Sequence, residues 1–187
     1  MRTKQKPQEQ EVYKETVKRI VTLGEIEDES VNYILVTIKE ANKEDEGIPY
    51  EKREWITIIL NSGGGDVYSA IALCDEISIS KTPIKVVVQG KAMSSALIIV
   101  ASAHYAEAGK RASFMYHEMH WSIDASGGVH KNEVKEFERL QSIYDSTLSE
   151  NCPGMTKEVL QSHRDTQIDW YFDSKKAIEL GLINSIS

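Results

Sequence analysis

The chain has 187 residues, of which 41% are apolar and 27% charged, and it carries a formal net charge of -7. This length and composition are ordinary for a single globular domain with a sizeable core. The acidic balance gives no support to nucleic-acid binding, which is usually accompanied by a basic patch. The longest apolar run, residues 96–101, is far shorter than the roughly 20 residues of a membrane-spanning helix.

The polar N-terminal segment, residues 1–17, is expected to be a flexible arm, and it lacks the apolar centre of a signal peptide. Residues 18–187 are expected to form one domain. Cys74 and Cys152 show no metal-ligand spacing, which favours reduced thiols in a cytoplasmic protein. We expect neither a metal nor a cofactor.

The first elements alternate between strand and helix patterns. Residues 19–23 predict a strand, and apolar residues at helical spacing predict a helix that Asp28 caps and that runs to about Lys43. Residues 41–54 are charged and contain a glycine and a proline, which indicates an exposed loop. Residues 55–60 are almost continuously apolar, as is typical of a buried parallel strand.

The remaining pattern continues the alternation to the C-terminus. It predicts a helix from about Asp66 that stops before Pro83, a strand over 84–88 ended by Gly90, a helix of small residues over 93–103 and a strand over 113–116. A long helix is predicted next, from Lys131 to near Glu150, where Pro153-Gly154 stops it. The last predicted elements are helices over 156–163 and 174–180, the second capped by Asp173 and closed by Gly181, and a strand over 182–186. Strands that alternate with helices indicate an α/β fold with a mainly parallel sheet.

The glycine triplet Gly63–Gly65 lies where a strand turns into a helix. At such a turn, backbone N–H groups point outward at the positive end of the helix dipole and suit an anion, either a phosphate or the oxyanion of an acyl-transfer intermediate. The phosphate motifs fail, because no Gly-Lys-Ser/Thr follows and Tyr68 stands where a dinucleotide fingerprint has its last glycine. A purely structural tight turn stays open.

Ser94 occupies the equivalent place one strand–helix unit later, at the sheet edge where ligands bind in open α/β folds. His117 follows a predicted strand and is a candidate general base. Asp169 is a candidate for orienting a histidine. The residues alone leave structural roles open: close helix packing for Ser94, an ordinary structural role for His117, and a cap or surface charge for Asp169. The competing histidines are His104, His120, His130 and His163.

Four segments of the chain carry a resemblance to one family: Asn61 to Gly65, Gly90 to Ser94, Met115 to His117 and Arg164 to Asp169. They are similar, in this order, to the Asn-Ser-Pro-Gly-Gly, Gly-x-Ala-x-Ser, Met-x-His and Arg-Asp-Thr-x-x-Asp motifs of the proteolytic subunit of the Clp protease, the ClpP family. The Gly-Leu-Ile end at residues 181–183 also fits. The chain resembles a divergent member of this family over nearly its whole length.

The resemblance implies a ClpP/crotonase-like fold, with repeated strand–helix units, a mainly parallel sheet and a protruding long helix in a handle region of about residues 119–151. It also implies a serine endopeptidase in which Ser94 is the nucleophile, His117 its base and Asp169 the group that orients the histidine. The backbone N–H groups of Gly65 and Ser95 are implied to form the oxyanion hole.

The resemblance further implies an assembly. Subunits of this family form stacked rings, usually of seven, that enclose the active sites in a chamber. The implied substrates are unfolded polypeptides fed in by a Clp-type AAA+ ATPase unfoldase, so the chain itself needs no ATP. Neither nucleic acid nor a membrane is implied as a partner.

The chain also departs from the family motifs. Gly63 stands in place of a proline, Ser95 of a methionine, Ala96 of a glycine and Glu118 of a common glutamine. Three alternatives therefore stay open: a catalytically inactive ring subunit, a crotonase-like acyl-CoA enzyme that shares the two-amide oxyanion arrangement, and a peptidase that pairs serine with Lys91.

Overall fold

The computed structural model describes residues 19–119 and 130–187. The expected arm, residues 1–17, and the segment with Gly127-Gly128 before the long helix lie outside the described residues. The elements are β1 (Ile20–Leu23), α1 (Asp28–Glu44), the 3-10 turn η1 (Tyr50–Lys52), β2 (Ile56–Ser62), α2 (Val67–Ile79), β3 (Ile84–Met93), α3 (Ala96–Ser102), β4 (Tyr105–Ala108), β5 (Ser113–Tyr116), α4 (His130–Asn151), α5 (Lys157–Thr166), β6 (Trp170–Asp173), α6 (Ser174–Glu179) and β7 (Ser185–Ile186).

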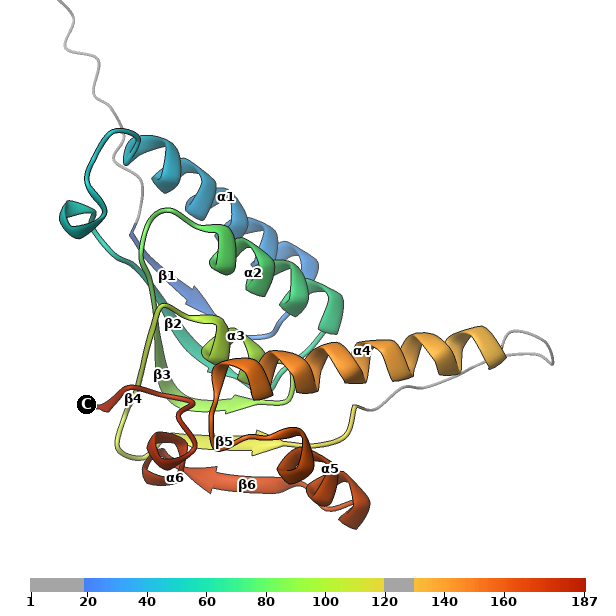
Figure 1. Cartoon of the computed structure of the whole chain (residues 1–187). Coiled ribbons are helices and arrows are strands. Elements are labelled where there is room, and N and C mark those ends of the chain that lie inside the picture. The colour runs from blue at the N-terminus through green and yellow to red at the C-terminus, as the bar shows by residue number, and fades with distance from the viewer. Residues whose placement is uncertain (1–18, 120–129) are drawn as a thin grey trace, which may run out of the picture.

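The strands form one sheet in the order β1-β2-β3-β4-β7, and all of these pairs are parallel. β5 pairs in parallel with β3, and β6 pairs with β5 in the antiparallel sense. Figure 1 shows α1, α2 and α3 on one side of the sheet, with α4 extending away from the body. The expected α/β fold with a mainly parallel sheet is confirmed.

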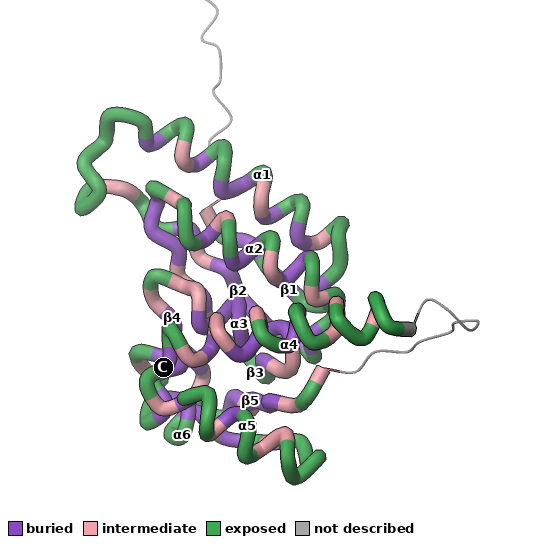
Figure 2. The backbone as a smooth tube through the Cα atoms, turned by 45° about the vertical axis from the view of Figure 1, so that its right-hand side comes forward, coloured by how far each residue is buried: buried purple, intermediate pink, exposed green. Residues whose placement is uncertain are grey.

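The core lies between the sheet and these helices. Every second residue of β1, β2 and β4, and of β3 as far as Val88, is buried. α3 is buried almost throughout, and its residues are mostly small or aliphatic. Figure 2 shows the buried positions concentrated along the strands and the inner sides of the helices. On the other side of the sheet, β1 is exposed, whereas β2, β3 and β4 carry half-buried residues that we call the open sheet face: Thr57, Ile59, Lys85, Val87, Tyr105 and Glu107.

β3 continues through Gly90 as far as Met93, so the expectation that Gly90 ends the strand is wrong. Gly90 has a φ of 96°, and a Cβ at this position would lie 2.8 Å from Oδ1 of Asn61. Before Gly90 the strand lies between β2 and β4, and after it between β2 and β5. The glycine therefore allows β3 to change neighbours without ending, which brings its last residues beside β5.

Three further expectations need correction. The N-cap of α1 is Glu27, which forms a capping box with Ser30, whereas Asp28 accepts a hydrogen bond from Ser69. The expected loop over 41–54 is not wholly exposed, because α1 continues into it and Asp45 is buried at its end. The helix expected over 93–103 begins only at Ala96, since Met93 still belongs to β3. The short strands β4 and β6 were not expected.

The long helix expected over 131–150 is confirmed as α4. Its C-terminal half packs on the body through Leu140, Tyr144 and Leu148, which are buried, whereas Val134 near its start is 45% exposed. In the described part of the chain, no helix is both long and apolar enough to span a membrane.

Candidate active site

Ser94 lies on the turn that joins β3 to α3, and its φ of 52° falls in the left-handed region. Non-glycine residues rarely adopt this conformation, which costs on the order of 1–3 kcal/mol and persists only when the surroundings impose it. The Ser94 N–H donates to the carbonyl of Met115 at 2.9 Å, and the Ser94 carbonyl accepts from the Tyr144 hydroxyl at 3.0 Å. The turn is thus held from β5 and from α4.

Two members of the glycine triplet, Gly64 and Gly65, are required by close approach of neighbouring atoms. Gly64 and Gly65 have φ values of 105° and 146°. A Cβ on Gly64 would lie 2.8 Å from Cβ and 3.3 Å from Oγ of Ser94, and a Cβ on Gly65 would lie 2.2 Å from the carbonyl oxygen of Ile26. Glycine at these two positions therefore lets the loop pack directly against the serine on one side and the β1–α1 connection on the other.

The two amides expected to form an oxyanion hole, those of Gly65 and Ser95, belong to segments that are bonded to each other. Oγ of Ser95, a residue only 4% exposed, donates to the carbonyl oxygen of Gly65 at 3.1 Å. Within residues 19–119 and 130–187, neither amide N–H donates to a protein acceptor. Among the described residues, both donors therefore remain without a partner.

A cavity of about 270 Å³ lies over the turn that carries Ser94. It is lined by Gly65, Asp66, Val67, Ser94, Ser95, His117, Met119 and Tyr144. A second cavity, of about 220 Å³, is bordered by both His117 and Asp169. His117 lines both cavities and so lies between the serine and the aspartate.

The imidazole of His117 and the carboxylate of Asp169 differ in their surroundings. Nδ1 of His117 contacts the carbonyl oxygen of Glu118. Asp169 is exposed in the single chain, although the aspartate of a serine–histidine–aspartate triad is usually buried. The structure therefore gathers Gly65, Ser94, Ser95 and His117 in one cavity and leaves Asp169 in the neighbouring one.

A sequence model of the Clp protease family matches residues 4–187. The chain belongs to the Clp protease family. It is 25% identical to the "ATP-dependent Clp protease proteolytic subunit" of Streptococcus mutans, with 94% of this chain and 88% of the relative aligned. It is 27% identical to the protein of that name from Streptococcus uberis, with the same coverage, and 27% identical to "proteolytic subunit 2" of Corynebacterium jeikeium, with 90% and 78% aligned.

The expected resemblance is thus confirmed, and the low identity makes the chain a divergent member of the Clp protease family. Membership of this family supports a peptidase activity for the chain. Its relatives are named as proteolytic subunits, and this name agrees with a cavity lined by Ser94, His117, Gly65 and Ser95.

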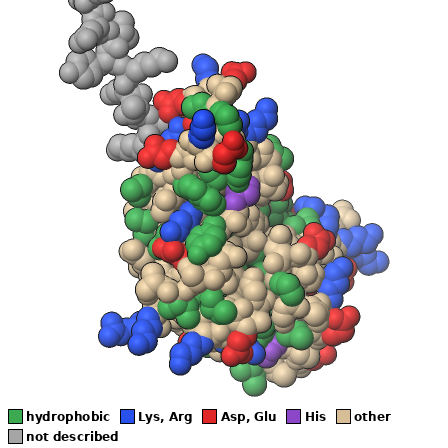
Figure 3. All heavy atoms as spheres, turned by 60° about the vertical axis from the view of Figure 1, so that its left-hand side comes forward, with side chains coloured by type: hydrophobic (Ala, Val, Ile, Leu, Met, Phe, Trp, Pro, Cys, Tyr) green, Lys and Arg blue, Asp and Glu red, His purple; other side chains and the backbone are tan. Residues whose placement is uncertain are grey.

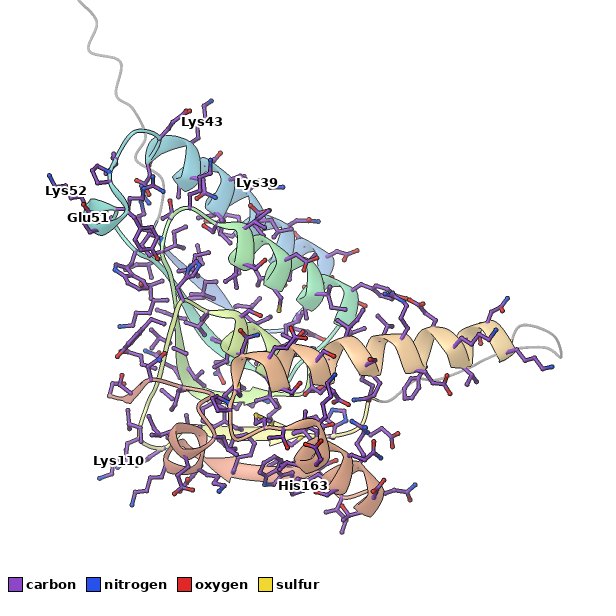
Figure 4. All side chains as sticks on the ribbon, viewed as in Figure 1. Lys39, Lys43, Glu51, Lys52, Lys110 and His163 are labelled. Carbon is purple, nitrogen blue, oxygen red and sulfur yellow. The ribbon has the colours of Figure 1, made fainter. Side chains whose placement is uncertain are left out.

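Other histidines of this Clp protease family member have different surroundings. Nδ1 of His104 accepts the N–H of Ile84 at 2.9 Å, at the end of β3 opposite Ser94. His163, labelled in Figure 4, stacks on Trp170 with ring centroids 3.9 Å apart, and burial lowers its pKa. His163 borders the cavity of Asp169 but not that of Ser94. His120 and the side chain of His130 lie outside the described residues.

Neither cysteine competes with Ser94 as a nucleophile. Cys74 and Cys152 are buried and free, and burial raises the pKa of each thiol to about 12. Both therefore stay protonated and inert. In the part of the chain that the structure describes, no three His, Cys, Asp or Glu side chains are grouped to hold a metal ion.

Sequence reasoning missed the hydrogen bond that Tyr144 donates to the Ser94 carbonyl. Burial raises the pKa of Tyr144 well above its ordinary value, so its hydroxyl remains a hydrogen-bond donor. The sequence showed Tyr144 only as one member of the apolar stripe of a helix, and no local signal links it to a serine 50 positions away.

Proposed function

We propose that this chain is a serine endopeptidase in which Ser94 attacks the peptide carbonyl, His117 accepts the Ser94 proton and Asp169 orients the imidazole. The observation that carries the proposal is the strained turn that holds Ser94 in a cavity shared with His117 and the amides of Gly65 and Ser95. Attack forms a tetrahedral intermediate, whose collapse releases the amine with a proton from His117 and leaves an acyl-enzyme that water hydrolyses.

The contact of His117 with Glu118 supports the role of the imidazole. In the tautomer that has its proton on Nδ1, this proton donates to the carbonyl and Nε2 is left unprotonated, as a general base requires. The carboxylate of Asp169, across the second cavity, would stabilise the imidazolium that forms. The two free amides would bind the oxyanion, and each such donor is worth on the order of 10² to 10³ in rate.

The proposal includes assembly into stacked rings that enclose the active sites. The half-buried open sheet face and the exposed start of α4 are surfaces that a single chain covers only in part. Figure 3, seen from the side opposite the free end of α4, shows hydrophobic side chains among polar ones on the surface. The names of the relatives contain both "ATP-dependent" and "subunit". We propose unfolded polypeptides as substrates and a Clp-type AAA+ ATPase as the partner that supplies them.

Fluorophosphonate labelling tests the nucleophile directly. We expect the probe to modify Ser94, as located by peptide mass spectrometry, and the labelling to be lost in Ser94→Ala and reduced in His117→Ala and Asp169→Asn. Ser162→Ala, which removes an exposed hydroxyl on α5, serves as the matched control and should label like the wild type.

A second candidate is a catalytically inactive ring subunit, which is favoured by the exposure of Asp169 in the single chain. The same experiment separates the two functions. Absence of labelling and of peptide hydrolysis in a sample shown by light scattering to be assembled would overturn the endopeptidase and support the inactive subunit.

A further inference from the structure

Asp145 on α4 is a buried carboxylate for which the proposed chemistry gives no reason. Asp145 as a whole is only 8% exposed. It accepts hydrogen bonds from the hydroxyl of Tyr116 at 2.7 Å and from Nε2 of Gln141 at 3.0 Å, and it pairs with the guanidinium of Arg164. A buried charge is costly unless it is paired and hydrogen-bonded, and replacing such a group by apolar residues is often neutral for stability. Stability alone therefore does not explain this buried charge.

The partners of Asp145 lie on both sides of His117. Tyr116 directly precedes the histidine, and its ring also stacks on Tyr144 with centroids 5.6 Å apart. Gln141, which donates to Asp145, accepts the backbone N–H of Met119 at 2.8 Å. The short segment that carries His117 is thus bonded to α4 immediately before and two residues after the imidazole.

Arg164 extends these bonds towards Asp169. Its guanidinium donates to the Tyr116 hydroxyl at 3.1 Å as well as pairing with Asp145, and it borders the cavity that His117 and Asp169 share. Arg164 lies near the end of α5, and the chain reaches Asp169 after Gln167, which has a φ of 54°. One carboxylate therefore links α4, the end of β5 and the end of α5.

We propose that Asp145 is a positioning residue, which holds the segment of His117 and the end of α5 in register so that the imidazole lies between Ser94 and Asp169. This inference rests on the proposed function. It assigns Asp145 no contact with substrate. A displacement of about 1 Å in a catalytic group is enough to cost on the order of 10² in rate, so the loss of this carboxylate should act on turnover.

The test compares Asp145→Ala, Asp145→Asn and Tyr116→Phe with the wild type, using a fluorogenic peptide and the fluorophosphonate probe. We expect kcat to fall about 100-fold in Asp145→Ala and about 10-fold in Asp145→Asn, which keeps an acceptor for Tyr116, while KM changes less than about twofold. Tyr116→Phe, which keeps the ring stack, should lower kcat by a few-fold. Labelling rates should fall in parallel. Glu150→Gln, an exposed carboxylate on the same helix, is the matched control and should match the wild type.

Hydrogen exchange of residues 114–119, followed by mass spectrometry, adds a readout that needs no activity. We expect this segment to exchange faster in the Asp145 variants, with the global unfolding transition still cooperative. A wild type that neither labels nor hydrolyses peptide would overturn the proposed function. Unchanged exchange at 114–119 would overturn the holding role of Asp145. A wild-type kcat in Asp145→Asn would overturn it as well. If both Asp145 variants fail to fold, a wild-type kcat in Tyr116→Phe is the result that would overturn it.

Discussion

The backbone of Ser94 stays in the left-handed region because hydrogen bonds from neighbouring elements fix the peptides on both of its sides. Serine itself gains nothing from this conformation, since its Cβ crowds the following carbonyl. The site therefore stores strain where the proposed nucleophile is presented, and the rest of the fold offsets it.

Because of this strain, we expect the glycine variant of Ser94 to be more stable than the alanine variant, the reverse of the usual order. Glycine usually destabilises a protein relative to alanine, but at a positive φ it carries no Cβ penalty. We expect Ser94→Gly to be about 1 kcal/mol more stable to urea than Ser94→Ala, and both to lack peptide hydrolysis. An alanine variant equal to or more stable than the glycine variant would show that the turn is not strained.

The sequence predicted the local turns on which the candidate residues Ser94 and Gly65 lie, whereas their roles stay predictions. Ser94 and Gly65 stand at strand-to-helix turns, which a strand pattern followed by a helix pattern locates. Asp145 was not predicted, because its partners Tyr116 and Arg164 are 29 and 19 positions away and no periodicity links them. The position of Asp169 relative to His117 likewise depends on how α5 packs, which one sequence does not encode in a readable pattern.

Among the elements, the start of β1, the end of α1 and the connection between α2 and β3 are joined through Asp45. Arg19 binds both carboxylate oxygens of Asp45 at 3.0 Å, and the Thr82 hydroxyl donates to one of them at 2.6 Å. Burial alone would raise the pKa of Asp45, but these hydrogen bonds and the nearby positive charges outweigh it and lower the pKa below its ordinary value.

Asp45→Asn should therefore destabilise the fold in a pH-dependent way. A carboxyl with a lowered pKa in the folded state stabilises the protein above its unfolded pKa, near 3.9, and this contribution is lost as the pH falls through the folded pKa. We expect a loss of about 2 kcal/mol in the free energy of unfolding at pH 7 that shrinks below about pH 4. Urea denaturation at both pH values measures it, and a loss independent of pH would contradict the linkage.

The long or strongly periodic elements were predicted within a few residues, as α4 and β2 show. The errors fell where a distant neighbour decides the outcome. β3 continues past Gly90 because β5 offers a new partner there, and β4, only four residues long, is defined by its pairing with β3 and β7. From the sequence alone, a glycine that ends a strand cannot be distinguished from one at which the strand continues beside a new neighbouring strand.

For the whole molecule, the open sheet face is the surface that most needs a partner in the proposed ring. Ile59 lies at its centre, between Thr22 on β1 and Val87 on β3. The side chain is only half-buried, so a single chain gains little from it, whereas an interface would bury it fully.

Ile59→Glu should accordingly reduce the assembly to smaller species while the fold of each chain survives. Light scattering after size exclusion measures the mass, and far-UV circular dichroism checks the fold. Val36→Glu, which changes an exposed valine on α1, is the matched control and should keep the wild-type mass. An unchanged mass for Ile59→Glu would remove this face from the proposed interface.

The stacking of Trp170 on His163 has an optical consequence. The indole lies nearly parallel to an imidazole that borders the cavity of His117 and Asp169. Indole emission responds to the charge and polarity of a stacked neighbour, so we expect protonation of His163, or a ligand that contacts it in this cavity, to change the fluorescence of Trp170. The protein thus carries a built-in reporter beside its candidate active site, readable without any dye as the difference between the wild type and Trp170→Phe.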